Sequence, residues 1–224
     1  MNLLSTSVLS ASDTDAVRRR AALAWLLAAG VPLLPGCTGT LLPKAAQPPA
    51  RFTLDSAMPE TAAPTPPAGA PTLTVDLPRA APGHDSRRMV FVRRPPELEA
   101  FGFHEWVEPP ARMLAPLLVR ALQDSGAFAA VLLAPSAAVG TWRLETSSLQ
   151  LQQDFTRKPS QVRLGLRAVL LDSATREVLA WREFETGVDA AGDDPVSGAQ
   201  AAQTAARQLA LAVAAFCARM TPAR

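Results

Sequence analysis

The sequence predicts one α+β domain, a curved and mostly antiparallel or mixed sheet with two helices packed on one face, and a mixed α/β sheet is the alternative. Residues 161–172 alternate apolar and polar side chains, and a turn at 173–175 returns the chain along 177–188. That pattern is typical of a long β-hairpin. Two other segments repeat apolar side chains every three or four positions, as amphipathic helices do. One lies between the early and late strands, and the other near the C-terminus.

The first half of the domain is predicted to contain short extended segments. Polar and apolar residues alternate in one of them, and another is apolar through its middle and ends at Pro95-Pro96. Residues 58–71 contain five prolines and no strong periodicity, so we expect a Pro/Ala-rich loop there. The expected extended segments are 51–55, 72–77, 88–93 and 98–103.

The first helix is expected to begin at Pro109-Pro110, because a missing backbone N–H costs least in the first turn. Gly126 stands where a left-handed C-terminal cap belongs. Pro116 lies inside this segment and removes one backbone hydrogen bond, so we expect a kink or a start near Arg112. The apolar stripe consists of Leu114, Leu117, Leu118, Ala121 and Leu122.

Two more strands, the long hairpin and the last helix follow. Residues 128–133 read as a strand, and residues 141–155 change the parity of their apolar side chains, which predicts a bulge near Ser147-Ser148. Asp193-Asp194-Pro195 is typical of a helix start. The helix presents a narrow apolar seam that packs either on its own sheet or on a partner helix. The seam is Ala199, Ala202, Ala206, Leu209, Val213 and Phe216.

The N-terminal region has the pattern of a bacterial lipoprotein signal. Three arginines at 18–20 precede an uncharged apolar stretch at 21–34, and Gly36 stands directly before Cys37. We expect residues 1–36 to be a signal peptide that is cut after Gly36, and the Cys37 thiol to carry acyl groups such as palmitate. The alternative, a buried helix with an incidental cysteine, would be broken by its prolines.

Residues 37–50 are expected to be a Pro/Ala-rich tether, and residues 51–220 to be the domain. Residues 38–50 could extend at most about 45 Å, so the domain would stay near its membrane. Thr38 follows the cysteine where an aspartate would favour retention in the inner membrane. We therefore expect an outer-membrane lipoprotein of a Gram-negative bacterium, facing the periplasm. The second cysteine, Cys217, lies among apolar residues and is expected to be a small buried hydrophobe.

Composition and motifs exclude several function classes. The formal net charge is +2, and removing residues 1–36, with three arginines and two aspartates, leaves +1, so we expect no nucleic-acid partner. His84 and His104 lack the spacing of metal ligands, and no cofactor or catalytic motif is present. His104-Glu105 could form an acid/base pair or a polar step beside a packing tryptophan. Asp193-Asp194 could be paired carboxylates, but a helix start explains them.

Residues 82–131 resemble the ABC-type transport auxiliary lipoproteins, the family that includes the paraquat-inducible lipoprotein PqiC. The signal at Leu34–Cys37 agrees with this resemblance, which continues more faintly through the hairpin and the last helix. Phe52 and Phe91 depart from it, because members of the family more often carry tyrosine there. The short sequence motifs that carry the resemblance most strongly are Glu105-Trp106, Pro110-Ala111-Arg112-Met113-Leu114 and Ser125-Gly126-Ala127-Phe128.

The resemblance implies a non-enzymatic component of a lipid transport system. Its partners would be an ABC permease, its ATPase and a substrate-binding protein with mammalian-cell-entry (MCE) domains. The lipoprotein would dock this substrate-binding protein at the outer membrane, and it could do so as a homo-oligomer. Trp106, Arg112 and Met113 are the candidate partner-binding residues, and internal packing is the alternative for Trp106 and Met113. Two other functions stay open: a periplasmic lipid-binding lipoprotein acting without the ABC complex, and a periplasmic hydrolase, for which no convergent residues are visible.

Overall fold

The computed structural model describes residues 48–55 and 64–221. The chain separates into residues 1–46 and 47–224, and all described residues belong to the second unit. The predicted signal peptide, Gly36, Cys37 and most of the tether lie outside the described residues.

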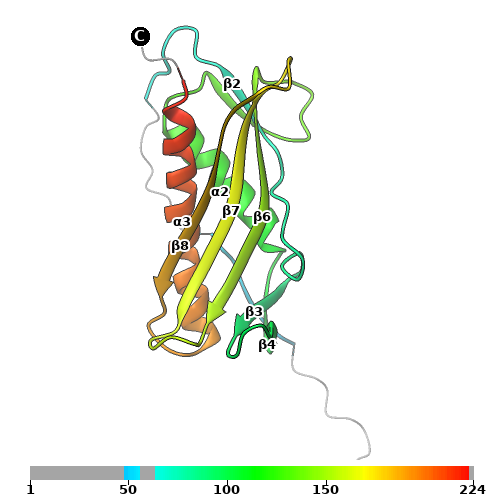
Figure 1. The fold of residues 1–224 in the computed structure, drawn as a ribbon, viewed down its shortest axis with the longest axis vertical. Helices are drawn as coiled ribbons and strands as arrows, with labels where there is room; N and C mark the ends of the chain where they lie inside the picture. The colour runs from blue at the N-terminus through cyan, green and yellow to red at the C-terminus, as the bar shows by residue number, and fades with distance from the viewer. Residues whose placement is uncertain (1–47, 56–63, 222–224) are drawn as a thin grey trace, which may run out of the picture. The chain divides into compact units, whose positions relative to one another are not determined.

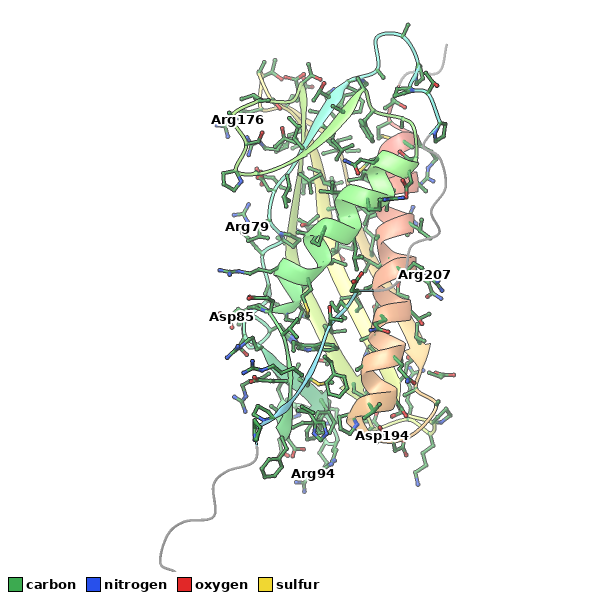
Figure 2. The ribbon with its side chains drawn as sticks, turned by 180° about the vertical axis from the view of Figure 1, so that it is seen from behind. Arg79, Asp85, Arg94, Arg176, Asp194 and Arg207 are labelled. Atoms are coloured by element: carbon green, nitrogen blue, oxygen red, sulfur yellow. The ribbon has the colours of Figure 1, made fainter. Side chains whose placement is uncertain are left out.

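The described residues form a single α+β domain with two helices and one eight-stranded mixed sheet, as the sequence predicts (Figure 1). The helices cover one face of the sheet and lie in front of it in Figure 2. Helix α2 packs on β2 and β5, whereas α3 packs on β7 and β8, and the two helices also contact each other. The elements are β1 (Ala50–Phe52), β2 (Thr72–Val75), β3 (Arg88–Val92), β4 (Glu99–Trp106), α2 (Pro110–Asp124), β5 (Ala130–Leu133), β6 (Trp142–Asp154), β7 (Gln161–Asp172), β8 (Val178–Asp189) and α3 (Pro195–Ala218).

Strand β6 connects all parts of the sheet. One of its edges pairs with β7 in an antiparallel ladder that β8 extends. The other edge pairs in parallel with β2 near its start, at Trp142, and with β3 near its end, at Asp154. Strand β2 also pairs with β5, β3 pairs with β4, and β4 pairs with β1. The mixed sheet therefore results from the different directions in which chain segments meet this one strand.

The predicted bulge in β6 is confirmed. The register with β7 shifts between Ser147 and Gln150, and Ser148 has a φ of 56°. A bulge inserts a residue and so reverses the parity of the side chains that follow it. Because of this reversal, Leu144 before the bulge and Leu149 after it are both fully buried.

Helix α2 begins at Pro110, so the alternative start near Arg112 is wrong. Pro110 lies in the first turn, where its missing N–H has no intrahelical partner to lose. Pro116 lies inside the helix, whose apolar stripe is buried against the sheet. Gly126 has a φ of +64° and follows the helix end, which confirms the predicted left-handed cap.

Helix α3 is capped by Asp194. The Oδ1 atom of Asp194 accepts hydrogen bonds from the backbone N–H groups of Val196 (2.8 Å) and Ser197 (2.9 Å), and Pro195 occupies the first turn. The predicted seam is buried throughout and packs on the chain's own sheet and on α2. Cys217 is also buried within the core, as expected, and this burial raises the pKa of its thiol to about 12.

Some strand limits differ from the prediction. Strand β1 covers Ala50–Phe52 instead of 51–55, and β5 covers only Ala130–Leu133. The short extended piece expected at 98–103 is a full strand, β4, which runs to Trp106. These limits depend on pairing partners distant in sequence: β4 extends because β1 and β3 both bind it.

Gly140 is expected to tolerate no side chain. A Cβ added there would lie 2.6 Å from the Thr72 carbonyl oxygen and 2.9 Å from the Thr74 backbone nitrogen. Because backbone atoms in a paired strand cannot move away easily, Gly140→Ala should lower the free energy of unfolding by about 1–3 kcal/mol. Gly102→Ala is the control, since a Cβ there meets nothing within 4 Å. Urea denaturation measures both, and equal stability of the two variants would contradict the close approach.

The Asp194 cap is expected to stabilise α3 in a pH-dependent way. Hydrogen bonds from the Ser197 hydroxyl, then from the Ser197 and Val196 backbone N–H groups, lower the pKa of Asp194. Asp194→Ala should therefore lower the free energy of unfolding by about 1 kcal/mol at pH 7. A lowered pKa in the folded state means that this stabilisation is present above the unfolded pKa and is lost as the pH falls through the folded pKa.

Denaturation at pH 7 and in acid would measure this dependence, with exposed Asp85→Ala as the control. A stability difference that is the same at both pH values would show that the ionised cap is not responsible.

Candidate functional site

The face of the sheet opposite the helices carries a hollow lined by polar and charged residues. Its antiparallel strands β6, β7 and β8 enclose a shallow hollow of about 400 Å³. Most of its lining side chains point away from the core, because successive residues of a strand point to opposite faces, whereas Leu166 and Phe184 belong to or pack on the core. The lining residues are Ser148, Gln150, Gln152, Arg163, Gly165, Leu166, Arg167, Glu183, Phe184 and Glu185.

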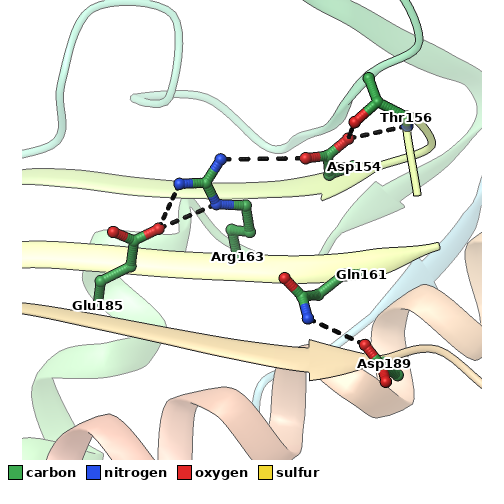
Figure 3. A network of polar contacts seen from close by, with 6 residues as sticks. All are labelled: Asp154, Thr156, Gln161, Arg163, Glu185 and Asp189. Carbon is green, nitrogen blue, oxygen red and sulfur yellow. Dashed lines mark hydrogen bonds and ion pairs between the residues drawn. The ribbon is translucent and has the colours of Figure 1, made fainter.

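Arg163 lies between two carboxylates in this hollow (Figure 3). Its Nε donates to Glu185 Oε1 at 2.9 Å, and its Nη1 lies 3.9 Å from Asp154 Oδ2. On the adjoining part of the face, Gln161 Nε2 donates to Asp189 Oδ1 at 2.9 Å. The surface thus presents alternating charges that are already paired with one another.

Asp154 stays ionised despite its burial. Burial raises the pKa of its carboxyl. Hydrogen bonds from the side chain and backbone of Thr156, together with the charges of Arg163 and Arg157, lower the pKa by more than burial raises it. The resulting pKa lies below the ordinary value for aspartate. Asp154 is therefore an anion that orients Arg163, and its arrangement is unsuited to an acid that gives up a proton near neutral pH.

An exposed tryptophan lies beyond the hollow, toward the tip of the β7–β8 hairpin. Trp181 is 61% exposed, and the guanidinium of Arg167 lies 5.4 Å from the centre of its ring. Arg167 also donates through Nη2 to Glu183 at 2.7 Å. Val178 and Leu179 are exposed next to it in the chain. We call Arg167, Val178, Leu179 and Trp181 the hairpin patch.

Sequence reasoning did not select Trp181, although a signal was available. Trp181 pairs with Val169, which has the opposite parity to the buried Ala168 and Leu170. A tryptophan that pairs with the solvent face of a hairpin must be exposed unless something covers it. The alternation in 161–172 thus already placed Trp181 on the outer face.

The structure separates the three predicted partner-binding residues. Trp106 is 3% exposed and Met113 is 9% exposed, and both belong to the hydrophobic core. This burial agrees with the packing alternative for these two side chains. Arg112, by contrast, points to the surface, where its Nη1 lies 3.7 Å from Glu108 Oε2.

In the part of the chain that the structure describes, His104 and Glu105 form no hydrogen bond or ion pair with each other. Glu105 accepts from Arg51 Nε at 2.9 Å, whereas the His104 ring stacks on Phe52 with 6.0 Å between ring centres. Asp193 Oδ1 accepts a hydrogen bond from the Ser160 backbone N–H at 2.9 Å, so this carboxylate holds the loop before α3 against the segment between β6 and β7.

The other histidine and the acidic groups give no metal site either. Burial lowers the pKa of His84, whose Nδ1 lies 3.3 Å from the Leu151 carbonyl oxygen. Within residues 48–55 and 64–221, no group of three His, Cys, Asp or Glu side chains could hold a metal ion.

The space between the sheet and the helices is small. A hollow of about 10 Å³ lies beside Trp106, between β3, β4 and β6 on one side and Gly198 and Ala202 of α3 on the other. That volume holds at most one water molecule. In the part of the chain that the structure describes, no helix is long and apolar enough to span a bilayer.

Comparison with known proteins identifies the family. The structure is similar to that of protein XCC0632 from Xanthomonas campestris, with a TM-score of 0.62 and 26% sequence identity over 77% of this chain and 93% of that one. It is also similar to that of an uncharacterized protein, with a TM-score of 0.57 and 12% identity over 76% of this chain and 99% of that one, which shows the fold alone. No curated protein matches the chain. The family model of the ABC-type transport auxiliary lipoprotein component matches residues 52–214, and the chain therefore belongs to the ABC-type transport auxiliary lipoprotein family.

Proposed function

We propose that this lipoprotein docks an MCE-domain substrate-binding protein of an ABC-type lipid transport system at the outer membrane. Acyl groups on Cys37 anchor it, the domain faces the periplasm, and the permease and ATPase of the same system complete the assembly. The protein acts by binding and not by catalysis. Family membership supports the transport role, and the outer-membrane position rests on Thr38 following the lipidated cysteine.

The closed interior is the observation that favours docking over lipid carriage. Sites that enclose a small molecule usually have volumes of about 300–1,000 Å³. The hollow between sheet and helices measures about 10 Å³, which is far too small for an acyl chain. The hollow of about 400 Å³ on the opposite face of the sheet is open and lined by paired charges, which suits contact with another protein better than storage of a hydrocarbon.

Two surfaces are suited to contact with the MCE protein. The hairpin patch combines an exposed tryptophan with an arginine, and these residue types are enriched among the residues that dominate binding energy. Arg112 is the second candidate. Its ion pair with Glu108 is exposed on both sides, and such pairs contribute little to stability, so Arg112 is free to exchange partners.

The direct test is crosslinking followed by affinity capture from native membranes with a tag after Arg224. An MCE-domain protein and its permease should be captured from the outer-membrane fraction. Cys37→Ala should abolish both acylation and capture from that fraction, because the domain would then have no anchor. A lipidated protein that is captured alone would contradict docking, and lipid extracted with it would favour the lipid-binding alternative.

Surface variants should separate the two candidate contacts. Trp181→Ala should lower the yield of the captured MCE protein by about tenfold or more if its ring is buried on binding. Its control is Leu211→Ala, another exposed apolar residue, which lies on α3.

Arg112→Glu is compared with Arg79→Glu, an arginine of similar exposure that pairs with Glu145 at 3.0 Å. If all four variants capture the partner as well as the parent protein, neither surface is the contact.

A further inference from the structure

The tether enters the domain at the end formed by β1, β3 and β4. Strand β1 starts at Ala50 and pairs in parallel with β4, Ala50 beside His104 and Phe52 beside Trp106. The Phe52 carbonyl oxygen also accepts a hydrogen bond from the Val107 backbone N–H at 2.8 Å. These contacts fix the start of the domain against β4, so any anchor upstream pulls on this end.

Three large apolar side chains are exposed on β4 or next to it. Phe103 is 68% exposed, Leu98 42% and Val107 39%. Phe103 directly precedes His104, whose backbone pairs with Ala50. Single exposed apolar residues are ordinary on protein surfaces. Here Leu98 precedes β4, Phe103 lies within it and Val107 follows it, so all three lie along the strand that pairs with β1, where the tether ends.

Two arginines follow β3 at the same end. Arg94 is labelled at this end in Figure 2, and its side chain is 81% exposed with a pair to Glu97 at 3.4 Å. Arg93 lies over the Phe91 ring at 4.7 Å, so its guanidinium is held in place. Amphipathic helices that lie in the headgroup region of a bilayer combine Trp, Phe and Leu with Lys and Arg, and these strands present the same types of side chain. Arginine forms strong, charge-assisted hydrogen bonds to phosphate groups.

The tether length keeps this end within reach of the membrane. Residues 38–50 span at most about 45 Å, which is close to the length of strand β6, at about 3.4 Å per residue. A short tether gives an effective concentration on the order of millimolar, so a weak contact is occupied most of the time. The orientation of the domain would then depend on which of its surfaces binds lipid best.

We propose that the end of the domain formed by β3 and β4 rests on the phospholipid surface, with Phe103 in the headgroup region and Arg94 on lipid phosphates. This proposal rests on the proposed anchor at Cys37. It sets the orientation of the domain: the opposite end of β6, with the hairpin patch, points away from the membrane toward the periplasm. In Figure 2, Arg94 and Arg176 mark these two ends.

Cysteine labelling of the lipidated full chain tests the contact. Phe103→Cys and Val139→Cys each introduce one reactive thiol, because Cys37 is acylated and Cys217 is 0% exposed with a pKa of about 12. Val139 is 74% exposed and precedes β6, whose far end pairs with β3. The Ser173 N–H, at the hairpin tip, donates to the Thr141 carbonyl oxygen at 2.8 Å, so Val139 belongs to the end away from β3.

An environment-sensitive fluorophore is attached to the introduced thiol of each variant. The labelled protein is then added to preformed vesicles of phosphatidylethanolamine and phosphatidylglycerol. These vesicles contain a doxyl-labelled lipid that quenches the fluorophore. The label at 103 should be quenched at least about fivefold more strongly than the label at 139 and should shift to the blue, since only the former enters the headgroup region. Equal quenching at both positions on vesicle-bound protein would overturn the membrane contact and leave the anchor intact. Protein that does not float with the vesicles and lacks acyl mass would overturn both, because the anchor itself would be missing.

Discussion

The antiparallel ladder between β6 and β7 is the interaction on which the rest of the structure depends. It joins Trp142 to Asp172 at one end and Asp154 to Gln161 at the other. Strands β2 and β3 bind the remaining edge of β6, and β8 binds the remaining edge of β7. Because side chains alternate along each strand, the same ladder supplies the buried leucines under the helices and the charged hollow on the opposite face. The core and the candidate interaction surface therefore cannot change independently.

Local patterns predicted the parts of the fold that local physics determines. The alternation in 161–172, the parity change at Ser147-Ser148 and the helix start at Asp193-Asp194-Pro195 all depend on neighbours in sequence, and all three are present. The full length of β4 could not be predicted, because it depends on β1 and β3. The same limit applies to the candidate site: Trp106 and Met113 are apolar residues in a family motif, and only packing against α3 and the sheet distinguishes them from Arg112 at the surface. Trp181 could have been found by extending the alternation across the hairpin.

A closed core and differentiated surfaces suit a protein that positions other components. The hollow beside Trp106 has room for about one water molecule, and our proposal places the binding surfaces on the outside of the domain. The exposed apolar residues of β4 lie near the tether, and the hairpin patch lies toward the other end of β6. In our proposal the first surface meets lipid and the second meets the transport partner, so the long strands act as a rigid spacer between membrane and partner. The binding free energy of each contact can stay modest, because the tether keeps the domain close to the membrane and so raises its effective concentration there.

Photocrosslinking in intact cells tests this arrangement most directly. A photoreactive amino acid replaces Trp181 in one variant and Phe103 in another, and mass spectrometry identifies what each has captured. The account predicts an MCE-domain protein at position 181 and phospholipid at position 103. Capture of the MCE-domain protein at 103, or of lipid alone at 181, would contradict it.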